Sequence, residues 1–151
     1  EQGRQTVDGL LATGRLTRVS PNRDYADLLL TQARAHVASA QAVVDADPSG
    51  AFALVYDAAR KALTAILVNE GLRTGGDGAH ALLLDVVLAQ LDPPLGSMFR
   101  PFSWMRPLRN HTQYPAPEHP VAQPEDVADA LPATTAMIDA AAKIIDQMPA
   151  Y

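Results

Sequence analysis

The stretch that decides the fold is AFALVYDAARKALTAILVNE, residues 51–70. Its apolar side chains recur at the i, i+3, i+4, i+7 spacing of an amphipathic helix, so they share one broad face. These side chains belong to Phe52, Val55, Tyr56, Ala59, Leu63, Ile66 and Leu67. The pattern predicts a buried helix from about Gly50 to Glu70, begun by Ser49 as N-cap and ended by Gly71 as C-cap.

Helical periodicity continues on both sides of this stretch. The segments that show it are residues 6–13, 22–45, 80–91, 95–108 and 124–147. Pro101 and Pro107 fall inside the fourth of these segments and are expected to kink or shorten it. Residues 71–78 contain four glycines and predict a flexible connector, because no strand precedes them and no Gly-Lys-Ser/Thr follows. We therefore predict an all-α helical bundle.

Composition excludes several classes of protein. The 151 residues are 48% hydrophobic and 19% charged, which favours one domain over residues 1–151, with residues 1–20 as an N-terminal extension or short helix. A net charge of −5 argues against binding extended duplex DNA. The lack of cysteine excludes disulfides. No apolar run approaches the roughly 20 residues of a membrane span, and we expect a cytoplasmic protein without membrane contact.

The stretch WMRPLRNHTQYP, residues 104–115, concentrates the chemistry in a segment without acids. Arg106 and Arg109 lie three residues apart, which on a helix places both guanidinium groups on one side. They repel each other unless carboxylates neutralise them, and a bound phosphate relieves that repulsion through bidentate hydrogen bonds. His111 could act as a general acid or base, and Tyr114 could orient a substrate. In the other interpretation, acids of other helices pair with both arginines and His111 is a solvated loop residue.

Polar residues outside this cluster have simpler interpretations. We interpret His80, at the start of a predicted helix, as a cap or packing residue rather than a catalyst. His119 could join His111, although the proline-rich chain between them leaves their distance undefined. Asp57 and Lys61 predict an i, i+4 ion pair, and alternatively Asp57 neutralises an arginine of the cluster. Without cysteine or a histidine pair at i, i+4, we predict no metal site, and nothing indicates a cofactor.

Two parts of the chain look like segments of a known family. Residues 51–63, followed by Gly71-Leu72, a glycine-rich loop and His80, resemble the middle of HEPN domains. Residues 105–115 resemble the downstream Arg-Asn motif of that superfamily, most closely its small actinobacterial-type members that end in Arg-Asn-x-x-x-Tyr-Pro. This resemblance implies an up-and-down bundle of four to five helices that pairs as a homodimer.

The resemblance also implies a type of chemistry. In active HEPN proteins an arginine and a histidine, spaced Arg-x4–6-His, meet their symmetry mates at the dimer interface and cleave RNA without metal. The histidine moves a proton, the arginine stabilises charge on the phosphate, and the product carries a 2′,3′-cyclic phosphate. This sequence offers two registers for the motif. Arg106 to His111 has the spacing but places Pro107 at the polar position, whereas Arg109 with Asn110 places Tyr114 where the histidine belongs.

We favour the second register, which leaves Arg109 and Asn110 as a phosphate or nucleotide site. In that register we do not expect nuclease activity, because a phenol with a pKa of about 10 is a poor general base at neutral pH. The expected function is then a nucleotide-, RNA- or partner-binding component of a defence or toxin–antitoxin-type system. Its partner could be an antitoxin, or a nucleotidyltransferase that modifies Tyr114. One alternative is an active, metal-independent endoribonuclease that uses Arg106, Arg109 and His111. A purely structural helical dimer is the other alternative.

Overall fold

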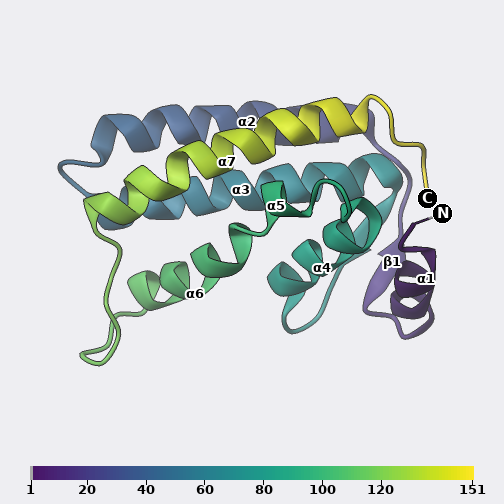
Figure 1. Cartoon of the computed structure of the whole chain (residues 1–151), viewed down its shortest axis with the longest axis horizontal. Helices are drawn as coiled ribbons and strands as arrows, with labels where there is room; N and C mark the ends of the chain where they lie inside the picture. The colour runs from purple at the N-terminus through teal and green to yellow at the C-terminus, as the bar shows by residue number, and fades with distance from the viewer. Residues whose placement is uncertain (1) are drawn as a thin grey trace.

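The computed structural model describes residues 2–151, and the predicted helical character is confirmed (Figure 1). In chain order the helices and strands are α1 (Arg4–Ala12), β1 (Leu16–Arg18), α2 (Arg23–Val43), α3 (Pro48–Glu70), β2 (Leu72–Thr74), α4 (Ala79–Leu91), α5 (Gly96–Phe99), α6 (Phe102–Gln113) and α7 (Pro124–Ile145). The helices α2 and α7 lie along one side of α3, and α4 and α6 lie along the other. The helix predicted from residues 51–70 is therefore the centre of the molecule.

The start of α3 corrects one prediction, and its end confirms another. The Asp47 side chain accepts a hydrogen bond from the Gly50 N–H at 2.9 Å, and Pro48 occupies the first turn. Asp47 is thus the N-cap in place of Ser49, because a proline suits the position directly after the cap. Gly71 ends the helix with φ +83°, a left-handed conformation that glycine adopts without steric cost.

Alanine makes the packing around α3 close. Ala58, Ala59 and Ala62 on α3 are fully buried, as are Ala26 and Ala33 on α2. Small side chains let two helix backbones approach, and the larger apolar groups of α3 fill the remaining space beside them. The core therefore runs along the whole length of α3 and forms one continuous cluster with α2 and α7.

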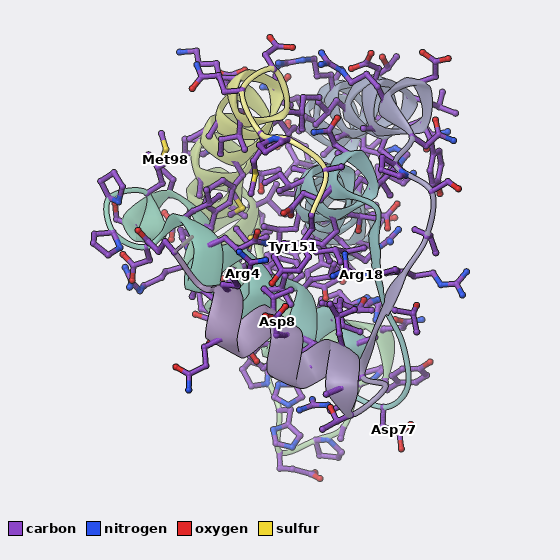
Figure 2. All side chains as sticks on the ribbon, turned by 90° about the vertical axis from the view of Figure 1, so that its right-hand side faces the viewer. Arg4, Asp8, Arg18, Asp77, Met98 and Tyr151 are labelled. Atoms are coloured by element: carbon purple, nitrogen blue, oxygen red, sulfur yellow. The ribbon has the colours of Figure 1, made fainter. Side chains whose placement is uncertain are left out.

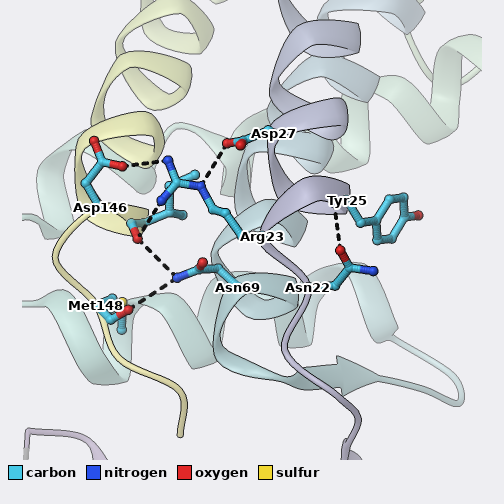
Figure 3. A network of polar contacts seen from close by, with 8 residues as sticks. Asn22, Arg23, Tyr25, Asp27, Asn69, Asp146 and Met148 are labelled. Atoms are coloured by element: carbon cyan, nitrogen blue, oxygen red, sulfur yellow. Dashed lines mark hydrogen bonds and ion pairs between the residues drawn. The ribbon is translucent and has the colours of Figure 1, made fainter.

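Polar contacts tie the ends of three helices together (Figure 3). At the start of α2, the Arg23 guanidinium donates to Asp27 at 2.9 Å and to Asp146, just beyond α7, at 2.5 Å. Near the end of α3, the Asn69 side chain donates to the backbone oxygens of Ile145 and Met148, both at 3.3 Å. The bond to Ile145 satisfies a carbonyl group that the last turn of α7 leaves without a helical partner, and the bond to Met148 holds the segment that follows α7.

The last residue is held against the first helix (Figure 2). The Tyr151 hydroxyl donates to Asp8 of α1 at 2.6 Å, and Arg18 of β1 donates to the Tyr151 backbone oxygen at 2.8 Å. The Tyr151 N–H donates to the Glu70 backbone oxygen at 2.9 Å. The segment after α7 thus crosses the end of α3 and joins α1 to the bundle.

A small two-stranded sheet, which the sequence did not predict, accompanies the helices. β1 and β2 pair in antiparallel fashion with Leu16 opposite Thr74, and β2 occupies part of the predicted glycine-rich connector. Each strand has only three residues, too few for periodicity to reveal. They are held by hydrogen bonds to a partner more than 50 residues away in sequence, which local patterns do not report.

The helical segment predicted over residues 95–108 is broken in two, as expected from its prolines. α5 ends at Phe99 and α6 begins at Phe102, so the break falls at Pro101, whereas Pro107 remains inside α6. No helix within residues 2–151 combines the length and apolar character that crossing a membrane requires.

Candidate functional site

Two arginines of α6 define the candidate site. Arg106 and Arg109 are half-buried on the same side of α6, and the Arg109 guanidinium lies over the Tyr56 ring of α3, 5.3 Å from its centroid. Within residues 2–151, no carboxylate forms an ion pair with either arginine, so the interpretation in which acids of other helices neutralise both is wrong for this part of the chain. The side-chain oxygen of Asn110 accepts a bond from Arg109 at 3.3 Å.

A tyrosine–histidine pair completes the site, and sequence reasoning missed it. The Tyr56 hydroxyl lies 2.8 Å from His80 Nδ1, and the Tyr56 ring stacks on Phe102 with centroids 5.1 Å apart. Tyr56 is 1% exposed. A buried phenol needs a hydrogen-bond partner, so the sequence indicated that Tyr56 has such a partner. The partner belongs to another helix, however, so the spacing of residues within α3 does not name it.

Burial and the neighbouring cations set the protonation of this pair. Burial raises the pKa of Tyr56 to about 12, with Arg109 and Arg106 acting in the opposite direction. Burial also lowers the pKa of His80, and the positive charges of Arg60, Arg109 and Arg106 lower it further. At neutral pH the pair is therefore an uncharged phenol hydrogen-bonded to an uncharged imidazole, held beside two cations.

Asp57 forms ion pairs with two cations of its own helix, Arg60 and Lys61. The predicted Asp57–Lys61 ion pair is confirmed at 3.3 Å, and Asp57 also lies 2.6 Å from Arg60 and 3.3 Å from His36 of α2. Burial raises the pKa of Asp57, but Arg60 and Lys61 outweigh that effect and the net shift is downward. These partners already compensate the charge of Asp57. The alternative interpretation, in which Asp57 neutralises an arginine of the cluster, is therefore wrong.

A pocket of about 660 Å³ opens beside Arg109, between the first half of α3 and the end of α6. Tyr56, Asp57 and Arg109 line one end, and Asp47 and Ser49 line the part at the start of α3. The side chains between them are apolar, and Thr112 and Gln113 of α6 contribute polar groups. The volume lies within the range of small-molecule sites. One cation and several hydrogen-bonding groups thus face a cavity of ligand size.

The other residues of the Arg/His cluster lie elsewhere. His111 follows Arg109 by two positions, or about 200° around the helix, which turns it to the opposite face. It stacks on His119, with ring centroids 4.0 Å apart and 5° between the planes, so the fold brings together the two histidines whose distance the sequence left undefined. Tyr114 is the C-cap of α6 and is 72% exposed. Within one chain, neither His111 nor Tyr114 forms a hydrogen bond or ring contact with the Tyr56–His80 pair.

Among residues 2–151, no group of three or more His, Asp or Glu side chains is arranged to hold a metal ion. The polar groups that line the pocket are the guanidinium of Arg109, the carboxylates of Asp47 and Asp57, the hydroxyls of Ser49, Tyr56 and Thr112, and the amide of Gln113. Comparison with protein-family models, with curated proteins and with solved structures found no match. The function is consequently argued from the site itself.

Proposed function

We propose that the chain is a HEPN-like domain that binds phosphate groups of a nucleotide or RNA through Arg106, Arg109 and Asn110. It would act in the cytoplasm as a binding component of a defence or toxin–antitoxin-type system. One observation carries the proposal: two half-buried guanidinium groups share one side of α6 without a carboxylate partner among the described residues, and Arg109 lines a pocket.

The electrostatics favour an anion at this position. The guanidinium groups of Arg106 and Arg109 lie on adjacent turns and repel each other. A third guanidinium, that of Arg60, lies close enough to lower the pKa of His80, as Arg106 and Arg109 also do. A phosphate accepts bidentate hydrogen bonds from arginine and cancels that repulsion. Because the whole chain carries a net charge of −5, the favourable region is confined to this site, which suits one or two phosphates rather than a long duplex.

The HEPN assignment is supported by the resemblance of residues 51–63 and 105–115, and by the central position of α3 among the long helices. We expect the protein to pair as a homodimer. Sedimentation equilibrium at micromolar concentration should then give twice the mass of one chain. A monomeric mass at those concentrations would refute the proposed dimer but would not bear on the proposed phosphate site.

The proposal is tested by fluorescence anisotropy with end-labelled single-stranded RNA and with a labelled nucleotide, both in EDTA. Arg109→Ala and Arg106→Ala should each weaken binding about tenfold or more, because each removes a charge-assisted contact. Arg15→Ala, which removes an exposed arginine between α1 and β1, is the matched control and should bind normally. Equal binding by all three variants would refute the phosphate site.

A second candidate function, metal-independent RNA cleavage, is favoured by the imidazole of His80. It is held beside Arg109 through Tyr56 and is uncharged at neutral pH, as a general base must be. In this reaction His80 takes the proton of the ribose 2′-hydroxyl and the 2′-oxygen attacks phosphorus. The bond to the 5′-oxygen breaks, and that oxygen takes up a proton. The products are a 2′,3′-cyclic phosphate and a free 5′-hydroxyl.

Three variants distinguish the possible acid–base groups. RNA and tRNA are incubated in EDTA with the wild type, His80→Asn, His111→Ala and Arg109→Ala, and the product ends are analysed. Cleavage lost in the His80 and Arg109 variants but kept in His111→Ala assigns the reaction to the Tyr56–His80 pair. Cleavage lost in His111→Ala assigns it to the Arg106–His111 register across a dimer. If the wild type cleaves neither RNA, the cleavage function is refuted and only the proposed binding function remains.

A further inference from the structure

We propose that the pocket beside Arg109 takes a single nucleoside monophosphate whose base carries an amino group, with the phosphate at Arg109 and the base at Asp47. The proposal rests on the proposed function, because it uses Arg109 as the phosphate ligand. To the proposed function it adds which kind of nucleotide binds, how that nucleotide is oriented in the pocket, and which residue recognises its base.

The charges along the pocket favour one nucleotide over a continuing strand. Arg109 is at one end, where Asp57 is already compensated by Arg60 and Lys61. Asp47, at the start of α3, forms no ion pair within residues 2–151. A strand that continued along the pocket would bring its next phosphate toward this carboxylate, which repels it. A single nucleotide places its only phosphate at the cationic end.

The length of the pocket favours a nucleotide over free phosphate. Asp47 and Tyr56 are nine residues apart on α3, which corresponds to about 13 Å along the helix. Phosphate, sugar and base joined in line can reach from one end to the other, whereas phosphate alone occupies only the end at Arg109. Between the ends, Ala53 and Leu54 offer apolar surface to the sugar and base, and the buried Phe52 ring lies behind them.

Asp47 has the chemistry to recognise an amino-bearing base. Its Oδ1 accepts the capping bond from the Gly50 N–H at 2.9 Å, and a carboxylate can accept several more hydrogen bonds. Carboxylate side chains accept from amino groups of bases, as at N4 of cytosine. Guanine presents a ring N–H and an amino group side by side, which suits a carboxylate best. Guanosine monophosphate is therefore the expected ligand among the common nucleotides.

The test compares guanosine monophosphate with inosine monophosphate, which lacks only the 2-amino group. Binding can be followed through Trp104, the one tryptophan of the chain, whose ring centroid lies 6.4 Å from that of Phe52 in the pocket wall. Calorimetry provides a second measurement that does not depend on fluorescence. Wild type should bind the guanosine nucleotide at least about tenfold more tightly than the inosine nucleotide.

Asp47→Asn is the informative variant. Asparagine is as good an N-cap as aspartate, so α3 should remain folded, and circular dichroism checks this. The variant should bind the guanosine nucleotide no better than the inosine nucleotide, while its affinity for the inosine nucleotide stays at or above that of wild type. Asp24→Asn, an exposed carboxylate in the first turn of α2, removes the same charge elsewhere and should behave as wild type.

The outcomes separate this inference from the proposed function. Equal affinity of wild type for the two nucleotides, or no effect of Asp47→Asn, would overturn the inference. The phosphate site would still stand if Arg109→Ala abolished binding of both nucleotides. If Arg109→Ala left every affinity unchanged, the proposed function would fail as well. Tighter binding of an oligonucleotide through several phosphates, with no preference for its terminal nucleotide, would also overturn the single-nucleotide assignment.

Discussion

Glu70 is a carboxyl group buried within the bundle, at the last position of α3. Its side chain is 2% exposed, and Gln90 of α4 donates a hydrogen bond to it at 3.1 Å. Burial raises its pKa to about 7, with the Gln90 bond acting in the opposite direction. Near neutral pH, this single residue therefore makes stability depend on protonation, and it does so away from the candidate site.

We predict that Glu70→Gln makes the protein less sensitive to alkaline pH. The folded pKa of about 7 lies above the ordinary glutamate value of 4.5, so the fold favours the protonated form. Its contribution is complete below about pH 4.5 and is lost as pH rises through 7. Glutamine keeps the acceptor oxygen and cannot ionise. Urea unfolding at pH 8 should show the variant more stable than wild type by about 3 kcal/mol, with a small difference at pH 5. A constant difference at both pH values would contradict the assignment.

His80 reports on the charge of Arg109. Burial lowers the pKa of His80, and the guanidinium of Arg109 contributes in the same direction, because a nearby positive charge disfavours the imidazolium. Arg109→Ala should therefore raise the His80 pKa. NMR titration of the imidazole measures this, and Arg15→Ala is the control with the same change in net charge. An unchanged His80 pKa in the Arg109 variant would place the two groups farther apart in solution.

At the scale of elements, the end of α3 is shaped by a close approach of backbones. Gly71 has φ +83°, and a Cβ built there would lie 2.6 Å from the Val19 backbone oxygen. The same glycine accepts the Val19 N–H at 2.9 Å, which joins the end of α3 to the residue after β1. The C-cap, the small sheet and the start of α2 are thus packed around one residue without a side chain.

Gly71→Ala should destabilise the protein by about 2–3 kcal/mol, and Gly76→Ala by about 1 kcal/mol. Both glycines have positive φ, so both variants carry the conformational strain of alanine in that region. Only the Cβ at position 71 meets another part of the backbone, since nothing lies within 4 Å of the Cβ position at Gly76. Denaturant unfolding measures the difference. Equal losses would mean that Val19 moves away at little cost.

At the scale of the whole molecule, an acidic chain carries a cationic site on α6. The net charge is −5, and the acid-free stretch contributes Arg106 and Arg109 to the site beside Arg60. An anionic ligand is therefore attracted to this site, while the net negative charge of the chain opposes its approach in general. This distribution limits how many phosphates of a nucleic acid can be neutralised at once.

The salt dependence of RNA binding should consequently be shallow. Neutralising one or two phosphates of a single strand predicts a slope of log K against log salt between about −0.7 and −1.4. Anisotropy titrations at salt concentrations from about 50 mM to about 200 mM measure this slope. A slope steeper than about −3 would indicate an extended cationic surface, contrary to the confined site.

Local patterns were sufficient for the helices and for part of the site. The periodicity of residues 51–70 located α3, Gly71 was recognised as its end, and the break at Pro101 was expected. The three-residue spacing of Arg106 and Arg109 placed both on one side of α6. Each of these features depends on residues within a few turns of one another, so helical geometry alone determines it.

The sequence by itself thus determined a helical protein with a buried central helix and a two-arginine face. Only the tertiary structure decided what that face meets: the Tyr56–His80 pair in place of His111, a pocket that reaches Asp47, and no carboxylate partner within residues 2–151. It also decided the β1–β2 pairing and the burial of Glu70. The physical reason is the same in each case. These contacts join segments distant in sequence, and their distances follow from how the helices pack rather than from any local propensity.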